Sequence, residues 1–187
     1  MPEAVVARAI VEEKENLVLY NEAICLMDRT SWEASVALTV LEKYVNGAII
    51  QRERIETDKS LLPGPGPGVD QRLMLTLFLD IHFYFICLDK ARSLFRRIVD
   101  IDRDLPLQKL MDRYEPRFRP YRRARNHLEH IEERIRPPYL GDFGNLSNDI
   151  YTFGGERFDI SRTGLTIFTD AYEELISILR TRERRHA

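Results

Sequence analysis

Hydrophobic residues recur at helical spacing along most of the chain. Apolar side chains recur near helical period over residues 3–28, which predicts a first helix. A second helix is predicted over 30–56, where TSWE offers Thr30 as N-cap and Glu33 as its reciprocal partner. A third is predicted over 71–99, and its middle is apolar on nearly every side, which is typical of a helix at the centre of a bundle.

Proline and glycine punctuate this helical pattern. The segment LLPGPGPGVD at 61–70 contains three Pro-Gly pairs, which exclude helix and favour a stiff loop within one domain. Residues 103–116 then predict a short helix with Pro106 near its first turn. The arginine-rich stretch 119–136 predicts a further helix, which Pro120 would open.

The period changes near the carboxyl end. Gly154-Gly155 lies between two short β-prone runs within 148–161 and predicts a hairpin that places Tyr151 opposite Phe158. A last helix is predicted from Ser161 or Thr163 to about residue 184, and the tail 181–187 is expected to fray.

The predicted fold class is therefore all-α. We expect an up-and-down bundle of about five main helices, with a short helix and a small β-hairpin insertion near 148–161. At 187 residues the chain predicts a single domain over 1–187.

Composition supports a folded protein in an aqueous, reducing compartment. Hydrophobic residues make up 44%, charged residues 31%, and the net charge is −2, so the overall charge demands no acidic partner. The most apolar run, 73–88, is interrupted by Asp80 and His82 and falls short of the about 20 apolar residues that a membrane span needs. Cys25 and Cys87 lie in apolar patterns without metal-ligand spacing, which predicts core residues and a cytoplasmic location without membrane contact.

Positive charge is concentrated in one segment. Residues 113–136 hold eight arginines against four glutamates. That local excess suits the binding of phosphate groups, and it equally suits a solvated helix face. The sequence leaves both interpretations open.

A helical wheel over 119–136 separates a core side from a polar side. The core stripe, spaced by three and four, consists of Tyr121, Ala124, Leu128, Ile131 and Ile135. The side turned away from it carries Arg119, Arg123, Asn126, His130 and Arg134. Arg125 falls on the flank with Glu129 as its i+4 neighbour, where an ordinary surface ion pair is the alternative to a functional role.

The stretch RNHLEH at 125–130 resembles the signature of the HEPN superfamily. In that signature an arginine, commonly followed by a polar residue, precedes a histidine by four to six positions, and Arg125, Asn126 and His130 match it. HEPN domains are helical bundles that carry the signature on a helix near the dimer-facing side. The resemblance in specific residues covers only 125–130, and the Pro-Gly loop at 61–70 and the hairpin at 148–161 are not parts of the minimal HEPN core.

The resemblance implies a metal-independent endoribonuclease that acts as a homodimer on RNA, as in toxins or defence effectors that have a protein antitoxin. In that scheme His130 transfers a proton at the ribose 2′-hydroxyl or the leaving 5′-oxygen, Arg125 holds the phosphate, and Asn126 orients the imidazole or bonds the phosphate. Flanking phosphates would be held by Arg119, Arg123 and Arg134.

A second hypothesis stays open at this point: a non-catalytic HEPN-like module that binds a nucleotide, nucleic acid or regulatory protein through its arginine-rich face. Capture of Arg125 by Glu129 would favour it. Neither hypothesis needs a cofactor, and no metal site is predicted, because His127 and His130 have no suitably placed third ligand. His82, in the third predicted helix, is expected to be a hydrogen-bonded core residue.

Overall fold

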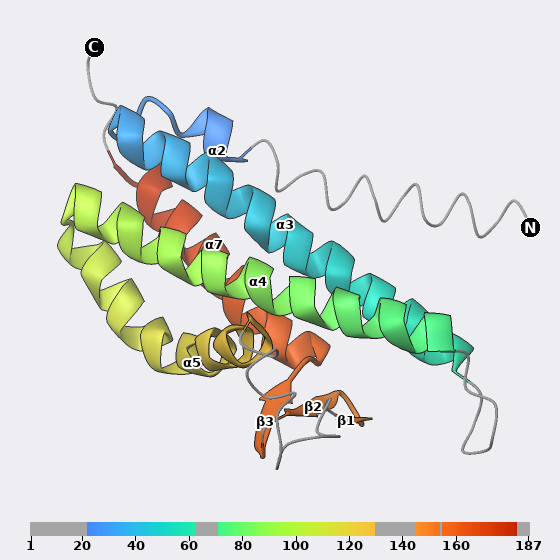
Figure 1. Cartoon of the computed structure of the whole chain (residues 1–187). Helices are drawn as coiled ribbons and strands as arrows, with labels where there is room; N and C mark the ends of the chain where they lie inside the picture. The colour runs from blue at the N-terminus through green and yellow to red at the C-terminus, as the bar shows by residue number, and fades with distance from the viewer. Residues whose placement is uncertain (1–21, 63–70, 130–144, 154, 183–187) are drawn as a thin grey trace, which may run out of the picture.

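Four long helices pack against one another, and a small sheet lies beside one end of the group (Figure 1). The computed structural model describes residues 22–62, 71–129, 145–153 and 155–182. Within them the elements are, in chain order, α2 (Glu22–Cys25), α3 (Trp32–Leu61), α4 (Gln71–Asp102), α5 (Leu105–Glu129), β1 (Asn145–Ser147), β2 (Ile150–Phe153), β3 (Glu156–Asp159) and α7 (Arg162–Arg180). The predicted all-α bundle with a small β insertion is confirmed.

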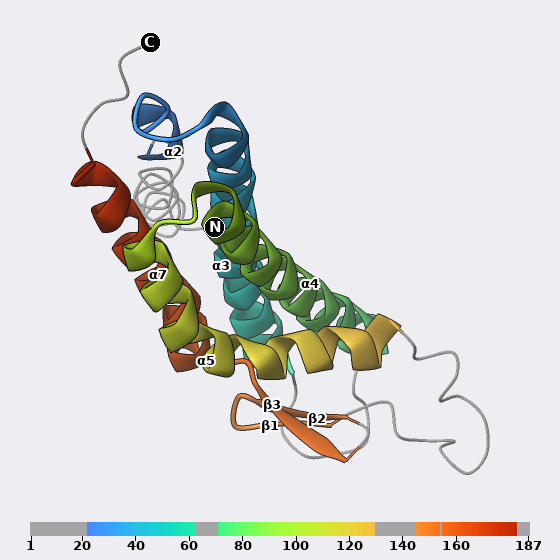
Figure 2. The same ribbon diagram turned by 90° about the vertical axis from the view of Figure 1, so that its left-hand side faces the viewer.

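Helices α3 and α4 run side by side in opposite directions along most of their length (Figures 1 and 2). Helix α3 begins one residue later than predicted, because Ser31 is the N-cap and its hydroxyl accepts a hydrogen bond from the amide of Ala34 at 3.2 Å. The predicted cap, Thr30, is buried and donates its hydroxyl to the carbonyl of Leu26 instead. The end of α3 reaches Leu61, five residues beyond the expected end.

The arginine-rich part of the chain forms one helix, and the prediction of two separate helices is wrong. Helix α5 contains both Pro116 and Pro120. Each lacks the amide hydrogen of a regular turn, and Figure 2 shows that α5 bends sharply midway instead of ending. Aromatic packing holds the two halves together, since the Phe118 ring stacks on Phe168 of α7 with centroids 4.4 Å apart.

The predicted hairpin is confirmed and belongs to a three-stranded antiparallel sheet of order β1-β2-β3. Tyr151 pairs with Phe158, as expected, and both side chains are buried. The additional strand β1 joins β2 through Asn148 and Asp149, whose φ angles are 47° and 61°. Two such residues at positive φ are typical of a tight hairpin turn.

Helix α7 closes the bundle and starts at one of the two predicted positions. Ser161 is its N-cap and accepts a hydrogen bond from the amide of Gly164 at 3.1 Å. A side chain at Gly164 would place its Cβ 2.6 Å from the hydroxyl of Tyr121, so glycine permits α7 to approach α5 closely. The buried residues of the four long helices and the sheet form one hydrophobic cluster.

Several predictions fall wholly or partly outside the described residues. Most of the first predicted helix, the Pro-Gly loop, and the chain after Arg182 lie there. Where the structure does describe the chain, no helix is long and apolar enough to cross a membrane. The prediction of two core cysteines is half wrong, because Cys25 is exposed, whereas burial raises the pKa of the Cys87 thiol to about 11.

Candidate functional site

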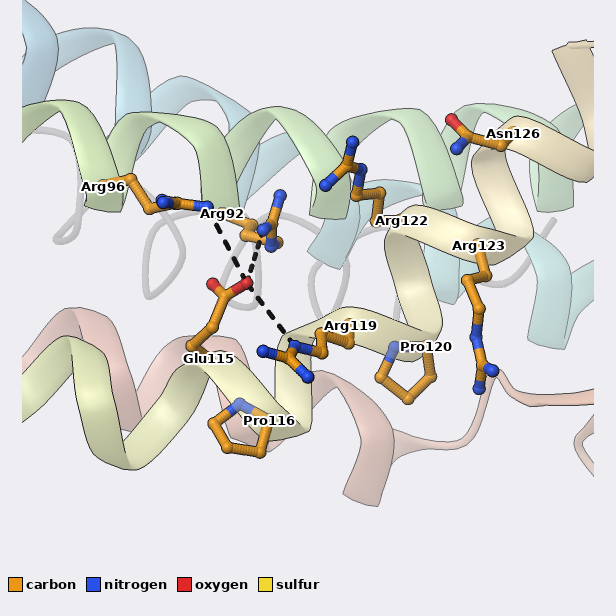
Figure 3. Close-up of a pocket in the computed structure, with 9 residues that line it drawn as sticks. All are labelled: Arg92, Arg96, Glu115, Pro116, Arg119, Pro120, Arg122, Arg123 and Asn126. Atoms are coloured by element: carbon orange, nitrogen blue, oxygen red, sulfur yellow. Dashed lines mark hydrogen bonds and ion pairs between the residues drawn. The ribbon is translucent and has the colours of Figure 1, made fainter.

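An open pocket of about 630 Å³ lies between α4 and the bent part of α5 (Figure 3). Its lining is dominated by five arginines and contains a single carboxylate. The residues that line it are Arg92, Arg96, Glu115, Pro116, Arg119, Pro120, Arg122, Arg123 and Asn126. A concave surface with this excess of guanidinium groups attracts anions.

Two helices supply the arginines, and the local sequence explains how. Arg92 and Arg96 are four residues apart on α4 and therefore share one face. The other three arginines of the lining, Arg119, Arg122 and Arg123, follow Pro116 on α5. The two prolines lie at the bend and in the pocket wall, so the bend that they produce brings Arg119 and Arg122 of α5 to the side of the pocket that faces α4 (Figures 2 and 3).

Glu115 lies between Arg92 and Arg96 of α4 and Arg119 of α5 (Figure 3). Its Oε1 atom is 2.5 Å from Arg92 and 4.0 Å from each of Arg96 and Arg119. Three guanidinium groups thus share one carboxylate oxygen. Arg123 points away and lies 3.5 Å from Glu156 of β3.

Arg92 forms the floor of the pocket. Its side chain is only 6% exposed, and its Nε atom has no hydrogen-bond partner among the described residues. Asp89, one turn earlier on α4, is 3.9 Å from the same guanidinium group. A buried cation is costly unless carboxylates or a bound anion compensate it, so Arg92 is a strong donor held in a poorly hydrated position.

Of the residues predicted from the sequence, three line the pocket together. Arg119, Arg123 and Asn126 lie on the side of α5 turned away from its core stripe, as the helical wheel predicted. Tyr121, Ala124 and Leu128 of that stripe are buried. The remaining predicted residues on the polar side and in the stripe lie outside the described residues: His130, Ile131, Arg134 and Ile135.

Arg125 interacts with two side chains of its own helix. Its guanidinium group lies 2.7 Å from Glu129 and donates a hydrogen bond of 3.0 Å to the side-chain oxygen of Asn126. Its Nε atom is 3.8 Å from Asp89 of α4. The predicted i+4 ion pair is confirmed, and Asp89 connects Arg125 to Arg92 at the floor of the pocket.

The two histidines that the structure describes, His82 and His127, contact aromatic side chains, and His127 also pairs with a carboxylate. His127 pairs with Glu156 at 3.1 Å and packs edge-on against Phe153, so it fastens α5 to the sheet. His82 is partly buried on α4 and contacts Phe78 edge-on. Burial lowers the pKa of His82, while nearby Glu129 opposes the shift. Within the described ranges no group of three potential ligands could hold a metal ion.

The α4 wall of the pocket was not predicted from the sequence. Arg92 and Arg96 were not predicted as site residues, nor were Glu115 and Arg122 of α5. The available signal was the pair of arginines four residues apart on a helix expected to lie at the centre of the bundle.

No protein-family model, curated protein or solved structure matches the chain. The chemistry of the pocket therefore has to supply the argument about function. Guanidinium groups bind phosphate through paired, planar hydrogen bonds. The described lining contains no histidine or cysteine, and Glu115 is bonded to Arg92. These residues are suited to holding an anion rather than to moving a proton.

Proposed function

We propose that the protein binds RNA through its phosphate groups, with the arginine pocket as the contact surface. The observation that carries this proposal is the ratio of five arginines to one carboxylate in a pocket between two helices. The arginines that the HEPN resemblance assigns to flanking phosphates, Arg119 and Arg123, belong to this pocket. The binding hypothesis also agrees with the capture of Arg125 by Glu129.

Binding of this kind has a recognisable salt dependence. Each phosphate neutralised on a single strand lowers the slope of log affinity against log salt by about 0.7. Removing a phosphate-binding arginine therefore weakens binding and flattens the slope together. Loss of folding would not change affinity and slope in this linked way.

The test is fluorescence anisotropy of a labelled single-stranded RNA with the full chain over a series of salt concentrations. We expect the double variant Arg96→Ala/Arg119→Ala to bind at least about tenfold more weakly with a shallower slope. Arg113→Ala is the matched control, because Arg113 is an exposed α5 arginine outside the pocket that pairs with Glu174. Equal weakening by both variants would contradict the proposal.

Metal-free RNA cleavage is a second candidate, favoured by the hydrogen bond from Arg125 to Asn126, which links two signature residues to the edge of the pocket. In this proposal His130 transfers the proton, and two copies of the chain combine their signatures in a homodimer. The test is incubation with RNA in excess EDTA. Products with 2′,3′-cyclic phosphate ends, lost in His130→Ala and Arg125→Ala, would support cleavage. Equal cleavage by both variants would show a contaminating nuclease.

A further inference from the structure

We infer that the pocket selects a terminal phosphate monoester of the RNA over the diester phosphates of the strand interior. This inference rests on the proposed RNA binding and names the part of the RNA that the pocket recognises. A monoester occurs at either a 5′ or a 3′ end. The shared chemistry is a phosphate with three free oxygens and a charge approaching −2 near neutral pH.

The cations of the pocket converge on one point. Arg92, Arg96 and Arg119 come from two helices, yet all three approach the same atom, Oε1 of Glu115 (Figure 3). A strand interior presents its phosphates in a row, and each has a sugar on both sides. A surface for such a row would distribute its arginines along a track. A focus of this kind instead suits one phosphate that is attached through a single oxygen.

The local charge also favours a monoester. Around the floor of the pocket four guanidinium groups share three carboxylates: Arg92, Arg96, Arg119 and Arg125 with Glu115, Asp89 and Glu129. Arg122, also in the lining, has no carboxylate within ion-pair distance among the described residues, so its charge raises the local excess to two. A monoester supplies about two negative charges, whereas a diester supplies one. The monoester therefore matches the local excess more closely.

The buried floor also favours an anion. The side chain of Arg92 is nearly inaccessible, and its Nε donor has no hydrogen-bond partner among the described residues. A buried donor without an acceptor is destabilising, and a phosphate oxygen is an acceptor. The pocket volume of about 630 Å³ falls within the range of small-molecule sites, so a terminal nucleotide fits its size.

The experiment compares three forms of one RNA, labelled internally, with a 5′-phosphate, a 3′-phosphate or hydroxyls at both ends. We expect a terminal phosphate to increase affinity for the full chain about tenfold or more near pH 7.5, and the comparison of the two phosphorylated forms identifies the preferred end. The preference should shrink near pH 5.5, because the second phosphate pKa is about 6.

Substitutions of single arginines test whether the pocket causes the preference for a terminal phosphate. Arg96→Ala and Arg119→Ala should each reduce it, and both side chains are exposed enough for the variants to fold. Arg113→Ala should retain it. Equal binding of all three RNA forms would overturn the inference and leave RNA binding in place. Absence of binding by every form would overturn both, and a preference retained in both pocket variants would overturn the assignment to this pocket.

Discussion

Two arginines, Arg52 on α3 and Arg92 on α4, are buried to a similar degree in different surroundings. Arg52 lies 2.6 Å from Glu56 and 3.3 Å from Asp149, and Lys59 pairs with the same two carboxylates. Two cations thus face two anions. This cluster ties the turn between β1 and β2 to α3, and it needs no further charge.

Around Arg92 the cations outnumber the carboxylates. Its main partner, Glu115, is shared with Arg96 and Arg119. Asp89, its second neighbour, is shared with Arg125. The comparison shows that burial of an arginine does not by itself indicate a binding site. The number of carboxylates available to each cation separates a cluster that holds the fold together from one that can accept an anion.

The largest expected effect is a loss of stability when the cluster of Arg52, Glu56, Lys59 and Asp149 is disrupted. Arg52→Met removes the buried guanidinium group that joins Glu56 to Asp149. Because Lys59 still pairs with both of these partly exposed carboxylates, we expect the free energy of unfolding to fall by about 2–3 kcal/mol. Urea denaturation measures this loss. RNA affinity of the folded fraction should not change, so a stable Arg52→Met protein with weakened RNA binding would contradict the division between the two clusters.

Smaller effects are expected at the cluster around Arg92 and Glu115, where one substitution should lower stability and raise RNA affinity. Glu115→Gln removes the charge bonded to Arg92, and we expect a loss of about 1–2 kcal/mol in unfolding free energy, since Asp89 remains nearby. The same change removes the pocket's carboxylate and should strengthen RNA binding severalfold. Denaturation and anisotropy on one preparation check both. Weaker RNA binding would mean that Glu115 is needed to orient the arginines.

Arg122 and Arg123 provide a finer comparison inside the pocket. Within the described part of the chain Arg122 has no ion pair, whereas Arg123 shares its charge with Glu156. We expect Arg122→Ala to weaken RNA binding by about 1 kcal/mol and Arg123→Ala by less, with little change in stability for either. Anisotropy at low salt ranks them. The reverse order would show that pairing in the free protein does not limit an arginine.

The smallest expected effect concerns pH. Burial lowers the pKa of His82 below its usual 6.5, and protonation adds a further cation beside Arg125 and Glu129 of α5. The unfolded chain therefore takes up this proton first, so stability falls as the pH drops from about 6.5 through the lower folded pKa. Urea midpoints near pH 7.5 and pH 5.5 should differ less in His82→Leu than in the unmodified chain. An identical pH dependence would rule out a contribution from His82.

The elements that were predicted correctly are those that local sequence patterns determine. The pairing of Tyr151 with Phe158 was predicted because the Gly-Gly turn fixes register. Strand β1 was missed although Asn148-Asp149 is a usable turn signal. Helix α5 was divided in two because proline usually ends a helix, and tertiary packing of Phe118 outweighs that local rule.

Only the α5 side of the pocket was predicted from the sequence. Periodicity placed Arg119, Arg123 and Asn126 on a common face, and the structure confirms that placement. It could not show that Arg92 and Arg96 face them, because contact between helices depends on the bend of α5 and on packing between segments distant in sequence. The roles assigned to His130 and Arg134 stay predictions.

The proline bend of α5 also amplifies small rotations, because the end of the helix lies far from the bend. Glu129 lies nine positions after Pro120, which corresponds to a length of about 14 Å along the helix. A rotation of about 10° at the bend would move the far end by about 2 Å, more than the difference between a direct and a broken hydrogen bond. The distance across the pocket therefore depends on the two uncharged residues of the bend, Pro116 and Pro120, as well as on the arginines.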